Sequence, residues 1–107
     1  FTDDLLLLRI FLDERQRFEH RALYEAIVLE ARRQNLAGAT VLRGILGFGA
    51  DSHIHSTKLL SIADNLPVVI EIIDSPENLK RLYPFLEENL QEGIVTEEKV
   101  RAFRPQT

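Results

Sequence analysis

The sequence predicts an α+β fold, a ferredoxin-like βαββαβ sandwich with two helices on one face of an antiparallel sheet. Apolar runs rich in β-branched residues alternate with two segments of helical periodicity, so the order strand, helix, strand occurs twice. A chain of 107 residues with 45% hydrophobic and 28% charged residues fits one globular domain. We therefore expect a single domain over residues 1–107, with residues 1–4 disordered or truncated and 104–107 as a tail.

The first half of the chain predicts strand, helix and strand. Residues 5–12 are short, apolar and bounded by charge, which is typical of a buried central strand. From 18 to 35 the apolar residues recur at spacings of three and four, which predicts an amphipathic helix that Gly38 closes. Residues 39–48 are aliphatic and β-branched and predict a second strand that runs into a glycine-rich segment.

The second half repeats this order. A third strand is expected within 57–74, where "LPVVIEIID" has the strongest strand signal. Ser75 as cap and Pro76 at the first helical position predict a helix start. Pro84 lies inside that helix and removes a backbone hydrogen bond, so we expect a kink or a break there. Residues 94–103 predict the last strand.

Composition excludes several classes of function. The chain has no cysteine, which excludes disulfides, thiolate zinc sites and a cysteine nucleophile. A net charge of −4 argues against a nucleic-acid binder, because such proteins carry a basic face. The longest apolar run, residues 5–12, is far shorter than the roughly 20 residues of a membrane span. We expect a cytoplasmic protein that does not insert into membranes.

The segment 43–60 is the first candidate for function, because it contains three glycines and two histidines. Gly44, Gly47 and Gly49 have no Cβ, so their backbone N–H groups are free to approach an anion. A glycine-rich bend where a strand leaves the sheet explains the same residues without a ligand. The cations that we expect to complete an anion site are Arg43, Lys58, Lys99 and Arg101.

A metal site and a catalytic site are the alternatives for this segment. His53 and His55 point to the same side if the chain is extended there, and with Asp51 they offer ligands for zinc or copper. Two histidines are too few for a stable site by themselves. Hydroxyl groups lie beside these histidines, but no nucleophile elbow surrounds them, so we expect no catalytic residues and no enzyme. These hydroxyl groups belong to Ser52, Ser56 and Thr57.

Three segments carry a family resemblance: "LLRIFLDE", "GATVLRGILGFGADSHIHSTKLLSIADNLPVVIEIIDSPE" and "EGIVTEEKVRAF". Through them nearly the whole chain resembles the PII-like superfamily, most closely the bacterial and archaeal family named domain of unknown function one-ninety. In PII signalling proteins a Gly-Phe-Gly motif opens a mobile loop between the second and third strands. In this chain Gly47, Phe48 and Gly49 resemble that motif.

The resemblance implies a homotrimeric regulator. Proteins of this kind bind adenine nucleotides in clefts between subunits and act on a transporter, a channel or an enzyme through the loop. Carried over to this chain, the loop is 47–57. Its partner-facing residues are Asp51, Ser52, His53 and His55. The ligand-binding residues are Arg43, Gly47, Gly49, Lys58, Lys99 and Arg101. No cofactor is implied besides the nucleotide.

Two departures from the PII pattern bear on the ligand. After Gly-Phe-Gly the PII sequence Arg-Gln-Lys-Gly is replaced by Ala-Asp-Ser-His over residues 50–53. The Thr-Gly-x-x-Gly-Asp-Gly-Lys loop before the last strand is replaced by "GIVTEEKVRAF", in which Lys99 takes the place of the motif lysine and Glu97 and Glu98 repel phosphate. We therefore expect AMP or ADP to bind more tightly than ATP. One alternative is a metal-binding trimer resembling CutA-type proteins, with His53 and His55 as ligands. The other is a purely structural oligomeric adaptor or a small enzyme.

Overall fold

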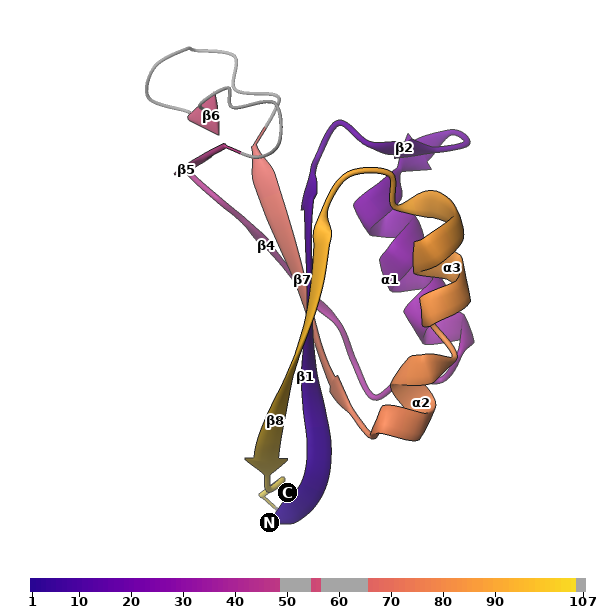
Figure 1. Cartoon of the computed structure of the whole chain (residues 1–107), viewed down its shortest axis with the longest axis vertical. Coiled ribbons are helices and arrows are strands. Elements are labelled where there is room, and N and C mark those ends of the chain that lie inside the picture. The colour runs from indigo at the N-terminus through magenta and orange to yellow at the C-terminus, as the bar shows by residue number, and fades with distance from the viewer. Residues whose placement is uncertain (49–54, 57–65, 106–107) are drawn as a thin grey trace.

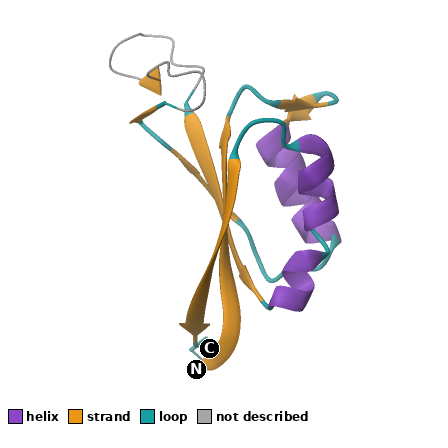
Figure 2. Ribbon diagram, in the orientation of Figure 1, coloured by secondary structure: helices purple, strands orange, loops and turns teal. Residues whose placement is uncertain are grey.

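The computed structural model describes residues 1–48, 55–56 and 66–105. Within them, four antiparallel strands form one sheet in the order β4-β7-β1-β8, and the helices lie on one of its faces (Figures 1 and 2). The strands of this sheet are β1 (Thr2–Asp13), β4 (Thr40–Arg43), β7 (Pro67–Asp74) and β8 (Ile94–Ala102). The helices are α1 (Leu23–Arg33), α2 (Pro76–Lys80) and α3 (Tyr83–Asn89). The predicted ferredoxin-like fold is confirmed.

Two short hairpins accompany the sheet. β2 (Arg17–Phe18) pairs with β3 (Arg21–Ala22) before α1. β5 (Leu46–Gly47) pairs with β6 (His55–Ser56) beyond the end of β4. Figure 1 shows β5 and β6 at one end of the sheet and the two termini at the other.

The first strand is longer than the sequence predicted. Residues 2–4, which we expected to be disordered, belong to β1, and Thr2 pairs with Ala102 of β8. The pairing shifts register between Thr2 and Leu5, and Asp4 has a φ of 62° within this irregularity. A β-bulge therefore interrupts the β1–β8 ladder near the chain ends.

The prediction of one helix over 18–35 was wrong at its start, because residues 17–22 form the β2–β3 hairpin. The prediction that Gly38 ends this helix was also wrong. Asn35 ends α1 with a left-handed φ of 62°, its N–H donates to the carbonyl of Arg32, and that of Leu36 donates to the carbonyl of Ala31. This Schellman motif satisfies the last carbonyls of the helix three residues before the glycine.

The predicted strand over 39–48 is divided into β4 and β5 at Gly44, whose N–H donates to the carbonyl of Pro67 at 2.7 Å. In the second half, the Ser75 hydroxyl caps α2 by accepting from the N–H of Asn78, as predicted. The expected break at Pro84 is confirmed, since α2 ends at Lys80 and Pro84 lies in the first turn of α3. A proline in a first turn costs no helical hydrogen bond.

The two faces of the sheet differ in chemistry. On the helix side the inward residues are buried in one core; from the two central strands they are Leu8, Ile10, Leu12, Val68, Ile70 and Ile72. On the other face an apolar row crosses all four strands in register, formed by Leu42, Val69, Phe11 and Ile94. Next to it, Arg9 binds Glu71 at 2.9 Å and Glu98 at 3.0 Å. The described helices leave this second face, which we call the open face, uncovered.

Candidate functional site

The loop base, defined here as residues 43–48 with Pro67, lies where β4 leaves the sheet. Arg43 ends β4 and binds Glu14 at 2.8 Å. The other oxygen of the Glu14 carboxylate accepts from the N–H of Leu66 at 3.0 Å. The carboxylate thus joins the end of β1, the end of β4 and the start of β7, and the charge of Arg43 is already paired within one chain.

Both glycines of the loop base pack against Pro67. A Cβ at Gly44 would lie 2.8 Å from Cγ of Pro67, and one at Gly47 would lie 3.1 Å from the same atom. The chain after β4 therefore packs directly on the proline ring at the start of β7. This contact explains both glycines without a ligand, as the interpretation of a glycine-rich bend predicted.

Three large apolar side chains of the loop base lie next to these glycines in the sequence. Ile45, Leu46 and Phe48 are 71%, 61% and 69% exposed. Such a concentration of exposed apolar residues is typical of a surface that contacts another molecule.

Lys99 and Arg101 lie at the opposite end of the sheet. Lys99 is the sixth residue of β8 and pairs with Leu6. The family resemblance predicts Lys99 in the loop before the last strand, at the place of the motif lysine. That prediction is wrong, because the loop before β8 is 90–93 and Lys99 lies within the strand. Arg101 binds Asp3 at 2.8 Å, and its guanidinium lies 4.5 Å from the centre of the Phe1 ring.

One chain does not bring the predicted ligand residues together. Arg43 pairs with Val68 of β7, whereas Lys99 lies across from Leu6, which pairs with Asp74. These two positions of β7 are about 20 Å apart at the rise of a β-strand. Other predicted site residues, namely Gly49, Asp51, Ser52, His53 and Lys58, lie outside the described residues, and for His55 only the backbone in β6 is described.

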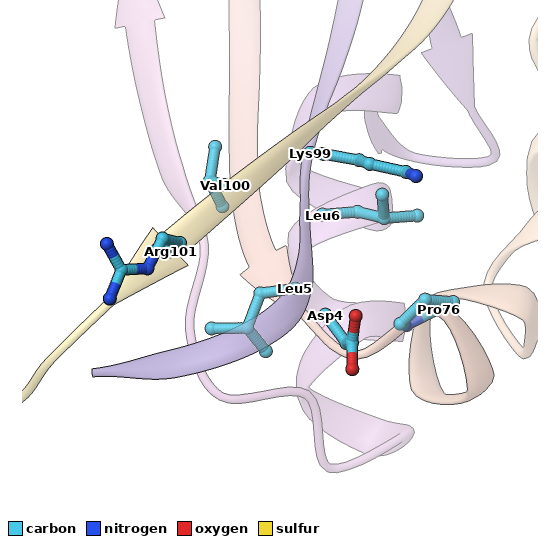
Figure 3. A pocket seen from close by; sticks show the side chains of 7 residues that line it. All are labelled: Asp4, Leu5, Leu6, Pro76, Lys99, Val100 and Arg101. Carbon is cyan, nitrogen blue, oxygen red and sulfur yellow. The ribbon is translucent and has the colours of Figure 1, made fainter.

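A pocket of about 310 Å³ adjoins Lys99 and Arg101, on the helix side of the sheet beside the start of α2 (Figure 3). Lys99 and Leu6 extend to the same side, with Asp4 and Pro76 below them in the view, whereas Arg101 extends to the opposite side. Arg101 pairs with Asp3. Lys99 makes no ion pair or hydrogen bond with any residue that the structure describes. The complete lining is Asp4, Leu5, Leu6, Pro76, Lys99, Val100 and Arg101. Sequence reasoning missed Asp4, because an acidic residue before an apolar run has no distinguishing pattern.

A second, polar pocket of about 480 Å³ lies at the loop-base end, beside the loop before β8. The Gln16 amide donates to the carbonyl of Glu92 at 2.7 Å, while its side-chain oxygen is buried without a partner among the described residues. Arg15 in this lining is paired with Asp13 at 3.0 Å. The lining holds Asp13, Arg15, Gln16, Arg17, Asn89, Gln91 and Glu92.

Two side chains with shifted pKa values belong to the scaffold around these pockets. Burial, and next the hydrogen bond that its hydroxyl donates to Glu97, raise the pKa of Tyr83. For Asp74 burial raises the pKa, but hydrogen bonds from the side chain of Asn78 and the N–H groups of Ala37 and Ser75 outweigh it and lower the pKa. Both groups join a helix or a loop to the sheet.

Within the described ranges, no three His, Cys, Asp or Glu side chains are grouped to hold a metal ion. His20 lies exposed at the turn between β2 and β3. The two histidines of the metal alternative, His53 and His55, have no described side chains. Among the described helices, none is long and apolar enough to cross a membrane.

Comparison with known proteins gives a family. Residues 5–102 match the model of the DUF190 family, which is described as "Uncharacterized ACR". A UPF0166 protein of Aquifex aeolicus (strain VF5) is 43% identical over 96 residues, covering 88% of this chain and 89% of the relative. A UPF0166 protein of Methanocaldococcus jannaschii is 37% identical over 82 residues, covering 77% of this chain and 75% of the relative.

Solved structures show the same fold. CPII from Thiomonas intermedia K12, a nitrogen regulatory PII-like protein bound to ADP, AMP and bicarbonate, superposes with a TM-score of 0.64 at 20% identity, covering 94% of this chain and 90% of CPII. A PII-like protein from Thermus thermophilus gives a TM-score of 0.65 at 21% identity, covering 90% of this chain and 86% of that protein. The predicted PII-like fold is thereby confirmed.

Proposed function

The chain belongs to the DUF190 family, and on that premise we propose that it is a PII-like trimeric signalling protein. In this proposal it senses an adenine nucleotide in clefts between subunits and acts on a partner through residues 47–57. The PII-like fold supports the proposal, as does the presence of ADP and AMP in the similar structure of CPII.

The observation that carries the proposal is the separation of the ligand residues within one chain. Arg43 and Gly47 lie at the loop-base end, and Lys99 and Arg101 lie about 20 Å away by strand register. A mononucleotide bridges that distance poorly. A cleft between subunits brings the loop base of one chain beside the Lys99 end of another.

The open face supports self-association. Its apolar row includes Leu42, Phe11 and Ile94, which are 48%, 39% and 63% exposed. Apolar side chains in register across four strands form a continuous surface rather than scattered contacts. In the proposed trimer this face is buried against the neighbouring subunits.

The charges described around the loop base favour a ligand with few phosphates. The carboxylate of Glu14 already pairs with Arg43, and the loop before β8, residues 90–93, contains Glu92 but no lysine or arginine. Each additional phosphate needs further cations, because burying unpaired charge is costly. AMP or ADP is therefore expected to bind more tightly than ATP.

The partner is expected to be a transporter, a channel or an enzyme. Ile45, Leu46 and Phe48 provide apolar contact area beside the loop. The loop residues Asp51, Ser52, His53 and His55 add polar groups. A combination of exposed apolar residues with polar groups is the usual composition of a protein–protein interface.

Thermal unfolding with AMP, ADP, ATP and cyclic nucleotides tests the ligand. A ligand that binds only the native protein stabilises it by about 2.7 kcal/mol at a hundred times its Kd. Gly49→Val should abolish the shift by blocking backbone approach, and Lys99→Ala should weaken it. Gly38→Ala is the matched control, because nothing lies within 4 Å of an added Cβ there. If no nucleotide shifts the melting temperature at millimolar concentration, the ligand half of the proposal is wrong.

Sedimentation equilibrium tests the assembly separately. The native chain should sediment as a trimer, and Phe11→Glu should shift it to monomer by placing a charge in the apolar row of the open face. Glu25→Gln, on the first turn of α1, is the control and should leave the trimer intact. A native chain that stays monomeric at all concentrations contradicts the proposed trimer.

A further inference from the structure

The pocket beside Lys99 has opposite charges on two sides of an apolar floor. Asp4 and Lys99 both line it, with Leu6 between them and Pro76 beside Asp4 (Figure 3). Neither charged side chain forms an ion pair or hydrogen bond with a residue that the structure describes. The two charges therefore remain available to a ligand.

Asp4 is also held in an uncommon backbone conformation. Its φ of 62° places it in the left-handed region, inside the bulge where β1 shifts register against β8. Aspartate adopts this region more readily than most residues because its side chain can bond locally, but the Asp4 carboxylate makes no such bond among the described residues. Strained residues of this kind concentrate at binding sites. Here the bulge directs a free carboxylate to the pocket.

The charge balance of the lining selects the ligand. Arg101 is paired with Asp3, so the unpaired charges are one carboxylate and one ammonium. Within this pocket the Asp4 carboxylate disfavours a ligand that carries only negative charge. A neutral ligand with one positive and one negative group satisfies both side chains.

The volume and the apolar lining of the pocket limit the ligand further. The volume of about 310 Å³ lies at the lower end of ligand pockets. Leu5, Leu6, Val100 and Pro76 supply apolar surface between the charges. We propose that this pocket is a ligand site contained within one chain, and that it binds a small zwitterionic amino acid with an aliphatic side chain. The ammonium group binds Asp4, the carboxylate binds Lys99, and the side chain packs on Leu6 and Pro76.

This site goes beyond the proposed nucleotide site and does not depend on it. It shares Lys99 and Arg101 with that site but adds Asp4 and requires no residue of a second subunit. The two proposals therefore fail or succeed in separate titrations.

Calorimetry of the full chain with three matched ligands tests the pocket. L-leucine carries both charges, L-leucinamide lacks the carboxylate, and 4-methylpentanoate lacks the ammonium group. Leucine should bind, and each analogue should bind about tenfold more weakly because it leaves one charged partner unsatisfied. Equal affinities for all three ligands, or no leucine binding at millimolar concentration, would overturn the proposal.

Two substitutions assign the charges. Asp4→Asn keeps the size and the tolerance of left-handed φ. It should lower leucine affinity about tenfold while leaving 4-methylpentanoate binding undiminished. Lys99→Met should lower leucine affinity by a similar factor and leave leucinamide binding unchanged. Lys80→Met, at the end of α2 and outside the lining, is the control. Undiminished leucine binding by a folded Asp4→Asn variant would overturn the proposal.

Discussion

The two ends of the sheet differ in how closely their side chains pack and in whether their cations are paired. At the loop base, Gly44 and Gly47 pack against Pro67 because they lack side chains, and the one cation there, Arg43, is paired with Glu14. At the end near the chain termini, long side chains surround a pocket, and Lys99 has no described partner. The glycines and the cation of the loop base are thus held by contacts within the chain, whereas Lys99 at the other end is not paired within the described residues.

We therefore expect substitutions at the two ends to have different effects on the free energy of unfolding. Substitutions at the loop base are expected to change the free energy of unfolding, because they disturb close contacts and paired charge. Substitutions of the unpaired pocket lysine are expected to change binding with little effect on folding. The predictions below test that contrast through urea unfolding at one fixed chain concentration, in order of decreasing effect.

Gly44→Val should have the largest effect. Its Cβ would lie 2.8 Å from the Pro67 ring, so the start of β7 or the chain after β4 must move. Such overpacking typically lowers the free energy of unfolding by about 1 to 3 kcal/mol. Gly38→Ala meets no atom within 4 Å and should be neutral or slightly stabilising. An equally stable Gly44→Val variant would show that the glycine–proline contact is not close-packed.

Glu14→Ala should have the next largest effect and lower the free energy of unfolding by about 1 to 3 kcal/mol. It leaves the N–H of buried Leu66 and the guanidinium of Arg43 without their acceptor. Glu14→Gln keeps an acceptor for Leu66 but loses the charge, so it should cost less than Glu14→Ala. Similar losses in both variants would assign the effect to the ion pair instead of the buried N–H.

Asp74→Asn should lower the free energy of unfolding by about 1 kcal/mol at pH 7 and by less at acidic pH. Burial raises the pKa of Asp74, but its hydrogen bonds lower it below the ordinary value of 3.8. A lowered pKa stabilises the native state above pH 3.8, and this contribution is lost as pH falls through the folded pKa. The difference between variant and native protein should therefore shrink below about pH 4. A constant difference down to about pH 3 would contradict this linkage.

Lys99→Met should have the smallest effect on folding, within about 0.5 kcal/mol, because the side chain is exposed and has no described partner. The same variant should lose ligand affinity. A stability loss comparable with that of Gly44→Val would show that Lys99 belongs to the scaffold, and the contrast between the two ends would fail.

Features fixed by neighbouring residues were predicted from the sequence. The Ser75 cap, the helix break at Pro84 and the order of strands and helices all depend on local backbone chemistry or on hydrophobic periodicity. The end of α1 was misassigned because Gly38 and Asn35 are both suited to a helix end, and only the backbone shows that Asn35 adopts the left-handed φ. The β2–β3 hairpin has no apolar alternation that distinguishes it from the start of a helix.

The sequence by itself determined the ferredoxin-like order and the identity of the candidate cations. Only the tertiary structure decided where those cations lie. Strand register places Lys99 on β8 opposite Leu6, far from Arg43, and the bulge at Asp4 brings a carboxylate to the same pocket. Register and bulges depend on pairing between residues distant in the chain, such as Thr2 with Ala102, and local periodicity carries no information about such pairs.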